Sequence, residues 1–99
     1  MSRIRILIAD HQPLMRQAIR QSLEVEEDFE VLGEAGDGET AVGLACRLDP
    51  DVVLVEVEMP RLDGLEATMR IKRARPAMSV LVLTAHDEEE HVVSLLDAG

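Results

Sequence analysis

The chain alternates short blocks of β-branched and other apolar residues with longer segments in which apolar residues recur at helical spacing. The short blocks cover residues 4–9, 29–34, 51–57 and 79–84. Three of them are almost continuously apolar, which is typical of strands covered on both faces of a parallel sheet. The block at 29–34 is interrupted by charged residues and suits a strand nearer an edge.

The segments between these blocks carry signals for the start of helices. Pro13 suits the first turn of a helix, and Asp37 can cap a second helix over residues 40–48. Capping-box spacing occurs twice more, at Asp63 with Glu66 and at Asp87 with Glu90. The last pair predicts a fourth helix over residues 87–98. Four strand-helix units with short connections predict an α/β fold: a doubly wound parallel sheet in a three-layer αβα arrangement.

Composition limits the classes of protein and partner. A chain of 99 residues with 46% hydrophobic residues has room for one core. Its formal net charge of -10 argues against a DNA-binding surface, which needs clustered cations. The single cysteine, Cys46, excludes an intrachain disulfide and fits a reducing cytoplasm. No stretch has the pattern of a signal peptide or a membrane span.

Polar residues gather where the expected strands end. In open parallel sheets, ligands bind at the carboxyl ends of the strands, and here these ends carry Asp10, His11, Glu56 and Thr84. Each has an ordinary explanation alone: an aspartate before a helix is often a cap, and a loop histidine is usually solvated. Glu56 is harder to dismiss, because a carboxylate in an apolar strand is costly to bury without a partner. No glycine-rich phosphate loop is present, which argues against a nucleotide-dependent enzyme.

Several segments resemble the receiver domain of two-component response regulators, and their sequences are most similar to the NarL/FixJ subfamily. They are residues 6–10, 33–38, 51–54, 59–60, 63–64 and 81–85. The resemblance covers essentially the whole chain. It implies a flavodoxin-like, five-stranded parallel sheet of order 2-1-3-4-5 flanked by five helices, and a phosphoryl group received from a histidine kinase. Residues 1–99 would then form a receiver domain without its fifth strand and helix.

The sequence departs from this family at the pocket. The resemblance implies an acidic pair after the first strand, and here Asp10 matches the first member while His11 replaces the second. Glu56 stands at the position of the phosphorylated aspartate, and its extra methylene displaces the carboxylate by about 1.5 Å. Thr84, followed by Ala85, matches the hydroxyl residue that senses the phosphoryl group.

These departures predict a weakened or lost Mg²⁺ site formed by Asp10, Glu56 and Glu58. Mg²⁺ requires hard oxygen ligands in near-octahedral geometry, and the imidazole of His11 is a poor substitute. A protonated His11 would instead replace the cation and pair with Glu56, while the longer Glu56 approaches Thr84. Conventional phosphotransfer is therefore expected to be impaired, since a misplacement near 1 Å costs about 10²-fold in rate.

The function expected from the sequence is that of an atypical receiver, not an enzyme, which regulates an attached helix-turn-helix DNA-binding domain through homodimerisation. A histidine kinase is the partner implied by the resemblance. Two alternatives remain: a conventional receiver carrying an engineered Glu56 phosphomimic, and a phosphorylation-independent module for protein interaction or ligand sensing. The shortened sheet also predicts that the block at 79–84 has an unpaired edge, covered by further chain or by a second copy. The expected helix over residues 87–98 is the predicted contact surface.

Overall fold

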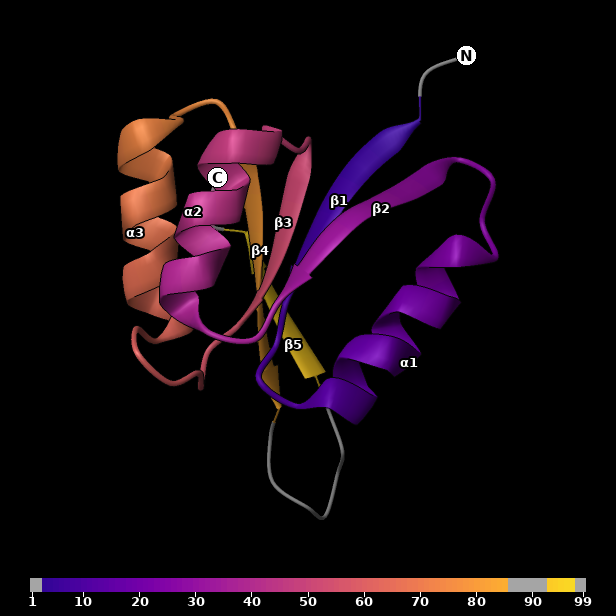
Figure 1. Ribbon diagram of the computed structural model, residues 1–99, viewed down its shortest axis with the longest axis horizontal. Helices are drawn as coiled ribbons and strands as arrows, with labels where there is room; N and C mark the ends of the chain where they lie inside the picture. Colours follow the sequence, from indigo (N-terminus) through magenta and orange to yellow (C-terminus); the bar gives the residue numbers. More distant parts are fainter. Residues whose placement is uncertain (1–2, 86–92, 98–99) are drawn as a thin grey trace.

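The computed structural model describes residues 3–85 and 93–97, which form one sheet and three helices (Figure 1). The elements follow the order β1 (Ile4–Ala9), α1 (Pro13–Glu24), β2 (Phe29–Ala35), α2 (Gly38–Leu48), β3 (Val52–Glu56), α3 (Gly64–Ala74), β4 (Ser79–Ala85) and β5 (Val93–Asp97). The strand order is β2-β1-β3-β4-β5, with β1 to β4 parallel. The predicted doubly wound sheet is confirmed, and β2 lies at its edge as the charge pattern indicated.

The predicted local signals shape the first three helices. Pro13 occupies the first turn of α1. Asp37 caps α2 by accepting a hydrogen bond from the backbone N–H of Thr40 at 2.8 Å. Asp63 caps α3 through the N–H of Glu66 at 2.9 Å. The side chain of Glu66 lies 3.5 Å from Arg70, one turn along the helix. Asp37 and Asp63 were therefore predicted correctly as caps, whereas the side chain of Glu66 contacts Arg70 and Asp87 lies outside the described residues.

The carboxyl-terminal segment corrects two predictions. Residues 93–97 form strand β5, antiparallel to β4, where a helix over residues 87–98 was expected; residues 87–92 and 98 lie outside the described residues. The register pairs Val82 with Leu96 and Ala85 with Val93. Backbone pairing explains the difference, because an edge strand offers unpaired N–H and C=O groups that a short apolar segment can satisfy. The sequence predicted an unpaired edge for β4, and this prediction is wrong, because β5 pairs with that edge.

One face of the sheet carries the larger part of the core. Helices α2 and α3 pack against each other and against this face, and Figure 1 shows them together on one side of the sheet. Fully buried strand residues alternate toward them: Leu7, Ala9, Val53, Val55, Val80 and Val82. From the helices, Ala41, Ala45 and Ile71 are 0% exposed. Small residues on α2 let the helix approach the strands closely.

The opposite face is covered by α1 alone among the described helices (Figure 1). No residue of α1 is buried, and its Leu14 is 79% exposed. On this face Ile6 and Ile8 of β1 are buried, whereas the alternate residues of β3 and β4, Leu54 and Leu81, are only partly buried. The sheet therefore has one closed face and one open face, and we use these two names below for the α2/α3 face and the α1 face.

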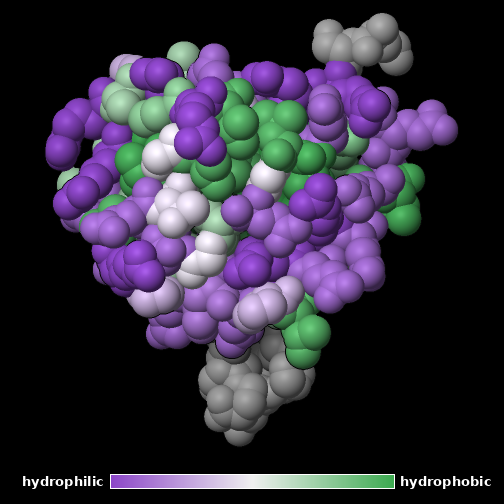
Figure 2. Space-filling model, viewed as in Figure 1, coloured by the Kyte–Doolittle hydropathy of each residue, from purple (hydrophilic) through white to green (hydrophobic). Residues whose placement is uncertain are grey.

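In the view of Figure 2, which includes α1, α2 and α3, the surface is mostly hydrophilic. A hydrophobic area lies over the carboxyl-terminal part of α2, where Leu44 and Leu48 are partly buried against the core. Among the described residues, no helix combines the length and apolar character needed to cross a bilayer.

Candidate functional site

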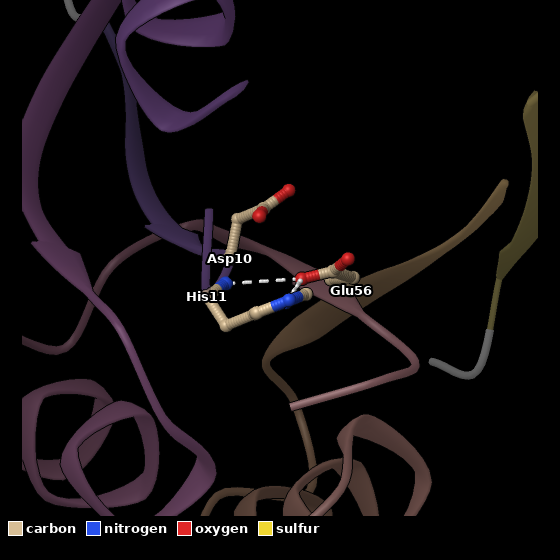
Figure 3. Close-up of side chains that lie close together, drawn as sticks. All are labelled: Asp10, His11 and Glu56. Atoms are coloured by element: carbon tan, nitrogen blue, oxygen red, sulfur yellow. Dashed lines mark hydrogen bonds and ion pairs between the residues drawn. The ribbon is translucent and has the colours of Figure 1, made fainter. Parts of the chain in front are cut away.

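The site lies at the carboxyl ends of β1 and β3, which are neighbours in the sheet. Asp10 directly follows β1, and Glu56 is the last residue of β3 (Figure 3). By strand alternation both side chains belong to the open face, at its carboxyl end. Gly64, at the start of α3, fits against this strand end, because a Cβ there would overlap the carbonyl oxygen of Glu56.

Glu56 binds His11 through one carboxylate oxygen. Its Oε1 accepts a hydrogen bond from the backbone N–H of His11 at 3.0 Å and lies 2.8 Å from the imidazole Nδ1 (Figure 3). The side chain of Glu56 is 17% exposed and that of His11 is 37% exposed. The hydrogen bond to Glu56 raises the pKa of His11 above its ordinary value, which favours the imidazolium and an ion pair.

Asp10 is almost completely buried, with 3% of its surface exposed. Its Oδ1 accepts a hydrogen bond from the backbone N–H of Gln12 at 2.8 Å. Burial raises the pKa of Asp10 to about 6; the N–H of Gln12 opposes this increase, and the Glu56 carboxylate adds to it. Asp10 therefore loses its proton at a higher pH than an exposed aspartate does. The neighbouring carboxylate of Glu56 is hydrogen-bonded to His11.

Arg16 supports this arrangement, and the sequence reading did not single it out. Its Nη1 donates a hydrogen bond to the backbone carbonyl of Asp10 at 2.8 Å, and its Nε lies 3.1 Å from Glu34 of β2. Arg20, one helical turn further, reaches the same carboxylate at 2.6 Å. The hydrogen bond from Arg20 is the main reason why the pKa of Glu34 lies below its usual range, and the hydrogen bond from Arg16 lowers this pKa further. The i, i+4 spacing of the two arginines on α1 was the available signal.

The remaining predicted site residues are placed as follows. Glu58 is exposed and lines the same cavity as Asp10, His11 and Glu56, but it is outside the group whose ligand atoms converge. Thr84 lies in β4, one residue beyond Leu83, which is in register with Glu56. The side chains of Thr84 and Ala85 lie outside the described part of the chain.

A cavity of about 490 Å³ extends from this site along the open face. Its polar end is formed by the acidic and imidazole groups. The apolar lining comes from α1, β3 and β4: Met15, Ile19, Leu54, Leu81 and Leu83. The groups that could carry chemistry are therefore continuous with apolar surface that the described helices do not cover.

The parallel strands follow the order β2-β1-β3-β4, and acidic groups lie at the ends of β1 and β3. Residues 6–99 match the response regulator receiver domain. The chain belongs to this family. It is 42% identical over 97 residues to the transcriptional regulatory protein YxjL of Bacillus subtilis, covering 98% of this chain and 44% of that protein.

Two further relatives support this assignment. The nitrate/nitrite response regulator NarP of Escherichia coli is 40% identical over 94 residues, which are 95% of this chain and 44% of NarP. The signal receiver domain of a NarL from Mycobacterium tuberculosis superimposes with a TM-score of 0.83 at 32% identity, over 93% of this chain and 74% of that structure. This receiver domain thus spans less than half the length of the curated relatives.

Receiver domains bind Mg²⁺ at the acidic pocket, so the residues present here can be compared with the needs of that ion. The converging ligand atoms belong to Asp10, His11 and Glu56, and one of them is an imidazole nitrogen. Oε1 of Glu56 is already engaged by two nitrogens of His11. Mg²⁺ demands oxygen ligands in near-ideal octahedral geometry, so this donor set does not fit it.

Proposed function

We propose that this chain is the receiver module of a response regulator that controls transcription, and that its pocket works without conventional Mg²⁺-dependent phosphorylation. The family and the names of the relatives support the first part. Because the net charge is -10, we assign DNA binding to an attached output domain. We expect a cytoplasmic protein whose input partner is a histidine kinase or a signal that replaces it.

The contact between His11 and Glu56 is the observation that carries the second part. Oε1 of Glu56 receives the backbone N–H and faces Nδ1 of His11 at 2.8 Å, so the oxygen expected to accept a phosphoryl group is engaged. An ion-paired, hydrogen-bonded carboxylate is a weak nucleophile, because its lone pairs are already directed at donors. In-line transfer also depends on position, and the longer side chain of Glu56 departs from the aspartate geometry.

The same contact has a structural consequence for signalling. It ties the loop after β1 to the end of β3 through a charged hydrogen bond across neighbouring strands. We infer that this link keeps the pocket in one arrangement in the absence of a phosphoryl group. The output would then be set by whether the His11–Glu56 contact is made or broken, a local change of charge with a distant readout.

Labelling with radioactive acetyl phosphate and Mg²⁺ tests the proposed function. We expect no stoichiometric labelling of the wild-type protein and recovery of labelling in the His11→Asp/Glu56→Asp double variant. Glu58→Asp is the matched control, because it shortens a neighbouring exposed carboxylate by the same methylene and should stay unlabelled. Stoichiometric labelling of wild type at Glu56 would contradict the proposal. Failure of the double variant to bind Mg²⁺ would place the defect elsewhere.

The proposed output is a change in homodimerisation. The exposed apolar side chains of the described helices supply candidate contact surface, with Leu14 at 79% and Met69 at 54% exposure. Analytical ultracentrifugation of wild type and of Glu56→Gln should give different monomer–dimer equilibrium constants. Identical constants would separate the pocket from assembly and remove this part of the proposal.

A second candidate function is the sensing of a small ligand. The cavity of about 490 Å³ favours it, because its apolar lining and polar end are the usual features of ligand pockets. A metabolite screen by thermal shift distinguishes the two candidates. A ligand-sensing module should be stabilised by a compound without any phosphodonor, and Leu81→Gln in the cavity wall should abolish that stabilisation.

A further inference from the structure

The peptide group that joins Asp10 to His11, called the 10–11 peptide below, is held at both ends by charged side chains. Nη1 of Arg16 donates a hydrogen bond to the carbonyl of Asp10 at 2.8 Å. At the other end, Oε1 of Glu56 accepts the N–H of His11 at 3.0 Å (Figure 3). The C=O and N–H of a trans peptide point in opposite directions, and the described residues contain no cis peptide bond. Arg16 and Glu56 therefore approach the 10–11 peptide from opposite ends.

The two charges have the signs that reinforce both hydrogen bonds. A guanidinium beside the carbonyl oxygen polarises the peptide and makes its N–H a stronger donor, and a carboxylate beside the N–H makes the carbonyl a stronger acceptor. Each bond is therefore expected to weaken when the other is lost. Nδ1 of His11 lies 2.8 Å from the same Oε1 of Glu56, so the orientation of the peptide also determines where the imidazole can lie.

Arg16 is itself held in place by β2. Its Nε donates to Glu34 at 3.1 Å, and its side chain is 21% exposed. Arg20 binds the other oxygen of the same carboxylate at 2.6 Å and donates to Glu24 at 2.9 Å. The two arginines therefore share Glu34, and it is Arg16 that extends this ion-pair network to the 10–11 peptide.

The chain leaves space for this guanidinium at Gly36, directly after β2. A Cβ added to Gly36 would lie 3.2 Å from Nη1 of Arg16, which is closer than ordinary van der Waals contact. The φ angle of Gly36 is not positive, so its backbone conformation does not require glycine. The nearby nitrogen of Arg16, which is the one that binds the Asp10 carbonyl, explains the missing side chain.

We propose that Arg16 is a positioning residue of the pocket: it orients the 10–11 peptide so that the N–H and the imidazole of His11 meet Glu56. Because Arg16 belongs to α1 and Glu34 to β2, the contact at Glu56 depends on how these two elements lie against the loop after β1. This proposal rests on the proposed function, since it concerns the contact that sets the output there.

Amide NMR and hydrogen exchange on the whole chain test this role. In Arg16→Met, which removes the guanidinium, the amide proton signal of His11 should move upfield. Exchange of the same N–H with solvent should accelerate by about tenfold or more, because its hydrogen bond to a charged group is weakened. The amide of Val53, which is 0% exposed in the closed face, reports general loosening of the fold and should change much less. Arg16→Lys keeps a cationic donor and should restore part of both changes.

Arg20→Met is the matched control, because it removes the other arginine on Glu34. It should leave the amide signal and the exchange rate of His11 unchanged. Circular dichroism checks folding, and if Arg16→Met does not fold, Arg16→Lys carries the test with a smaller upfield shift. Unchanged His11 signals in the folded Arg16 variants, or an equal change in Arg20→Met, would overturn the proposal. No phosphodonor is present, so labelling of the wild type at Glu56 would contradict the proposed function without altering these readouts.

Discussion

The closed and open faces of the same sheet differ in packing although they share the same strands. On the closed face, Val53, Val55, Val80 and Val82 are at most 1% exposed beneath α2 and α3. On the open face, the alternate residues of β3 and β4 are only partly buried, and α1 contributes no buried residue. Strand alternation thus divides β3 and β4 between a core and a cavity wall, whereas Ile6 and Ile8 of β1 are buried on the open face as well.

The titratable groups follow the same division. Among the described residues, the closed face contains one buried polar side chain, Thr68, whose hydroxyl donates to the carbonyl of Gly64 at 2.7 Å. The open face ends in Asp10, His11 and Glu56, where charge is concentrated and incompletely compensated. Stability is therefore expected to come mainly from the closed face. The groups whose charge can change lie on the open face, where a change costs little packing.

The largest expected effect comes from deleting core volume on the two faces in turn. Ile71→Ala removes a fully buried side chain of α3 and should lower the free energy of unfolding by about 2–5 kcal/mol. Ile19→Ala removes the same atoms from the partly buried side of α1 and should cost about 1 kcal/mol. Urea unfolding followed by circular dichroism measures both. Equal losses would show that the two faces do not differ in their contribution to stability.

A smaller effect is expected where α3 meets the end of β3. A methyl group at Gly64 would overlap the carbonyl oxygen of Glu56, so Gly64→Ala should destabilise the protein by about 1–3 kcal/mol. Gly43→Ala is the matched control, because nothing lies within 4 Å of its added Cβ and the site is helical. That control should stabilise by about 0.5–1 kcal/mol. Thermal unfolding gives the sign of both changes, and a stable Gly64→Ala protein would argue against the close contact.

The regular elements could largely be predicted from local sequence, whereas longer-range contacts could not. Apolar blocks and capping residues such as Asp37 and Asp63 act within a few positions, so they predicted β1 to β4 and α1 to α3. The segment at 93–97 was predicted wrongly, because its apolar residues suit either a helix or a strand. Pairing with β4, which no local signal within the segment specifies, decides for the strand.

The candidate site shows the same limit. That Asp10 and Glu56 lie close together follows from their places at the ends of parallel strands. The spacing of Arg16 and Arg20 places both on one side of α1, but the contacts of Arg16 with the carbonyl of Asp10 and with Glu34 depend on how α1 packs against β2. The cavity likewise results from how the described elements cover the open face.

Asp10→Asn tests whether charge on the open face opposes folding. Burial raises the pKa of Asp10 to about 6 from about 3.8, so the folded state favours the protonated carboxyl. The contribution of this protonation to the stability of the fold is fully present below pH 3.8 and is lost as pH rises through 6. The pKa difference limits the cost of charging Asp10 in the folded protein to about 3 kcal/mol. Burying the amide of an asparagine at this position also costs free energy, so the variant gains less than this limit. Asp10→Asn should therefore be about 1–2 kcal/mol more stable than wild type at pH 7–8 and no more stable at pH 4. Urea titrations at both pH values measure this, and a less stable variant at pH 7.5 would contradict it.

The smallest expected effect is that of the His11–Glu56 contact. Glu56 raises the pKa of His11, so the stability that the pair supplies is fully present below the usual histidine pKa of about 6.5. It is lost as pH rises through the raised value in the folded protein. Both side chains retain solvent access, so His11→Gln should cost only about 0.2–1 kcal/mol at pH 6 and almost nothing at pH 9.

A double-mutant cycle of His11→Gln with Glu56→Gln isolates this interaction from other histidines, because only coupling between the two sites survives the subtraction. The coupling should decrease between pH 6 and pH 9, in a window above the one in which Asp10 titrates. A coupling independent of pH would mean that the contact is a neutral hydrogen bond. His11 would then not change its charge near neutral pH as part of this contact. At neutral pH the open face would differ from the closed face in packing but not in a titrating ion pair.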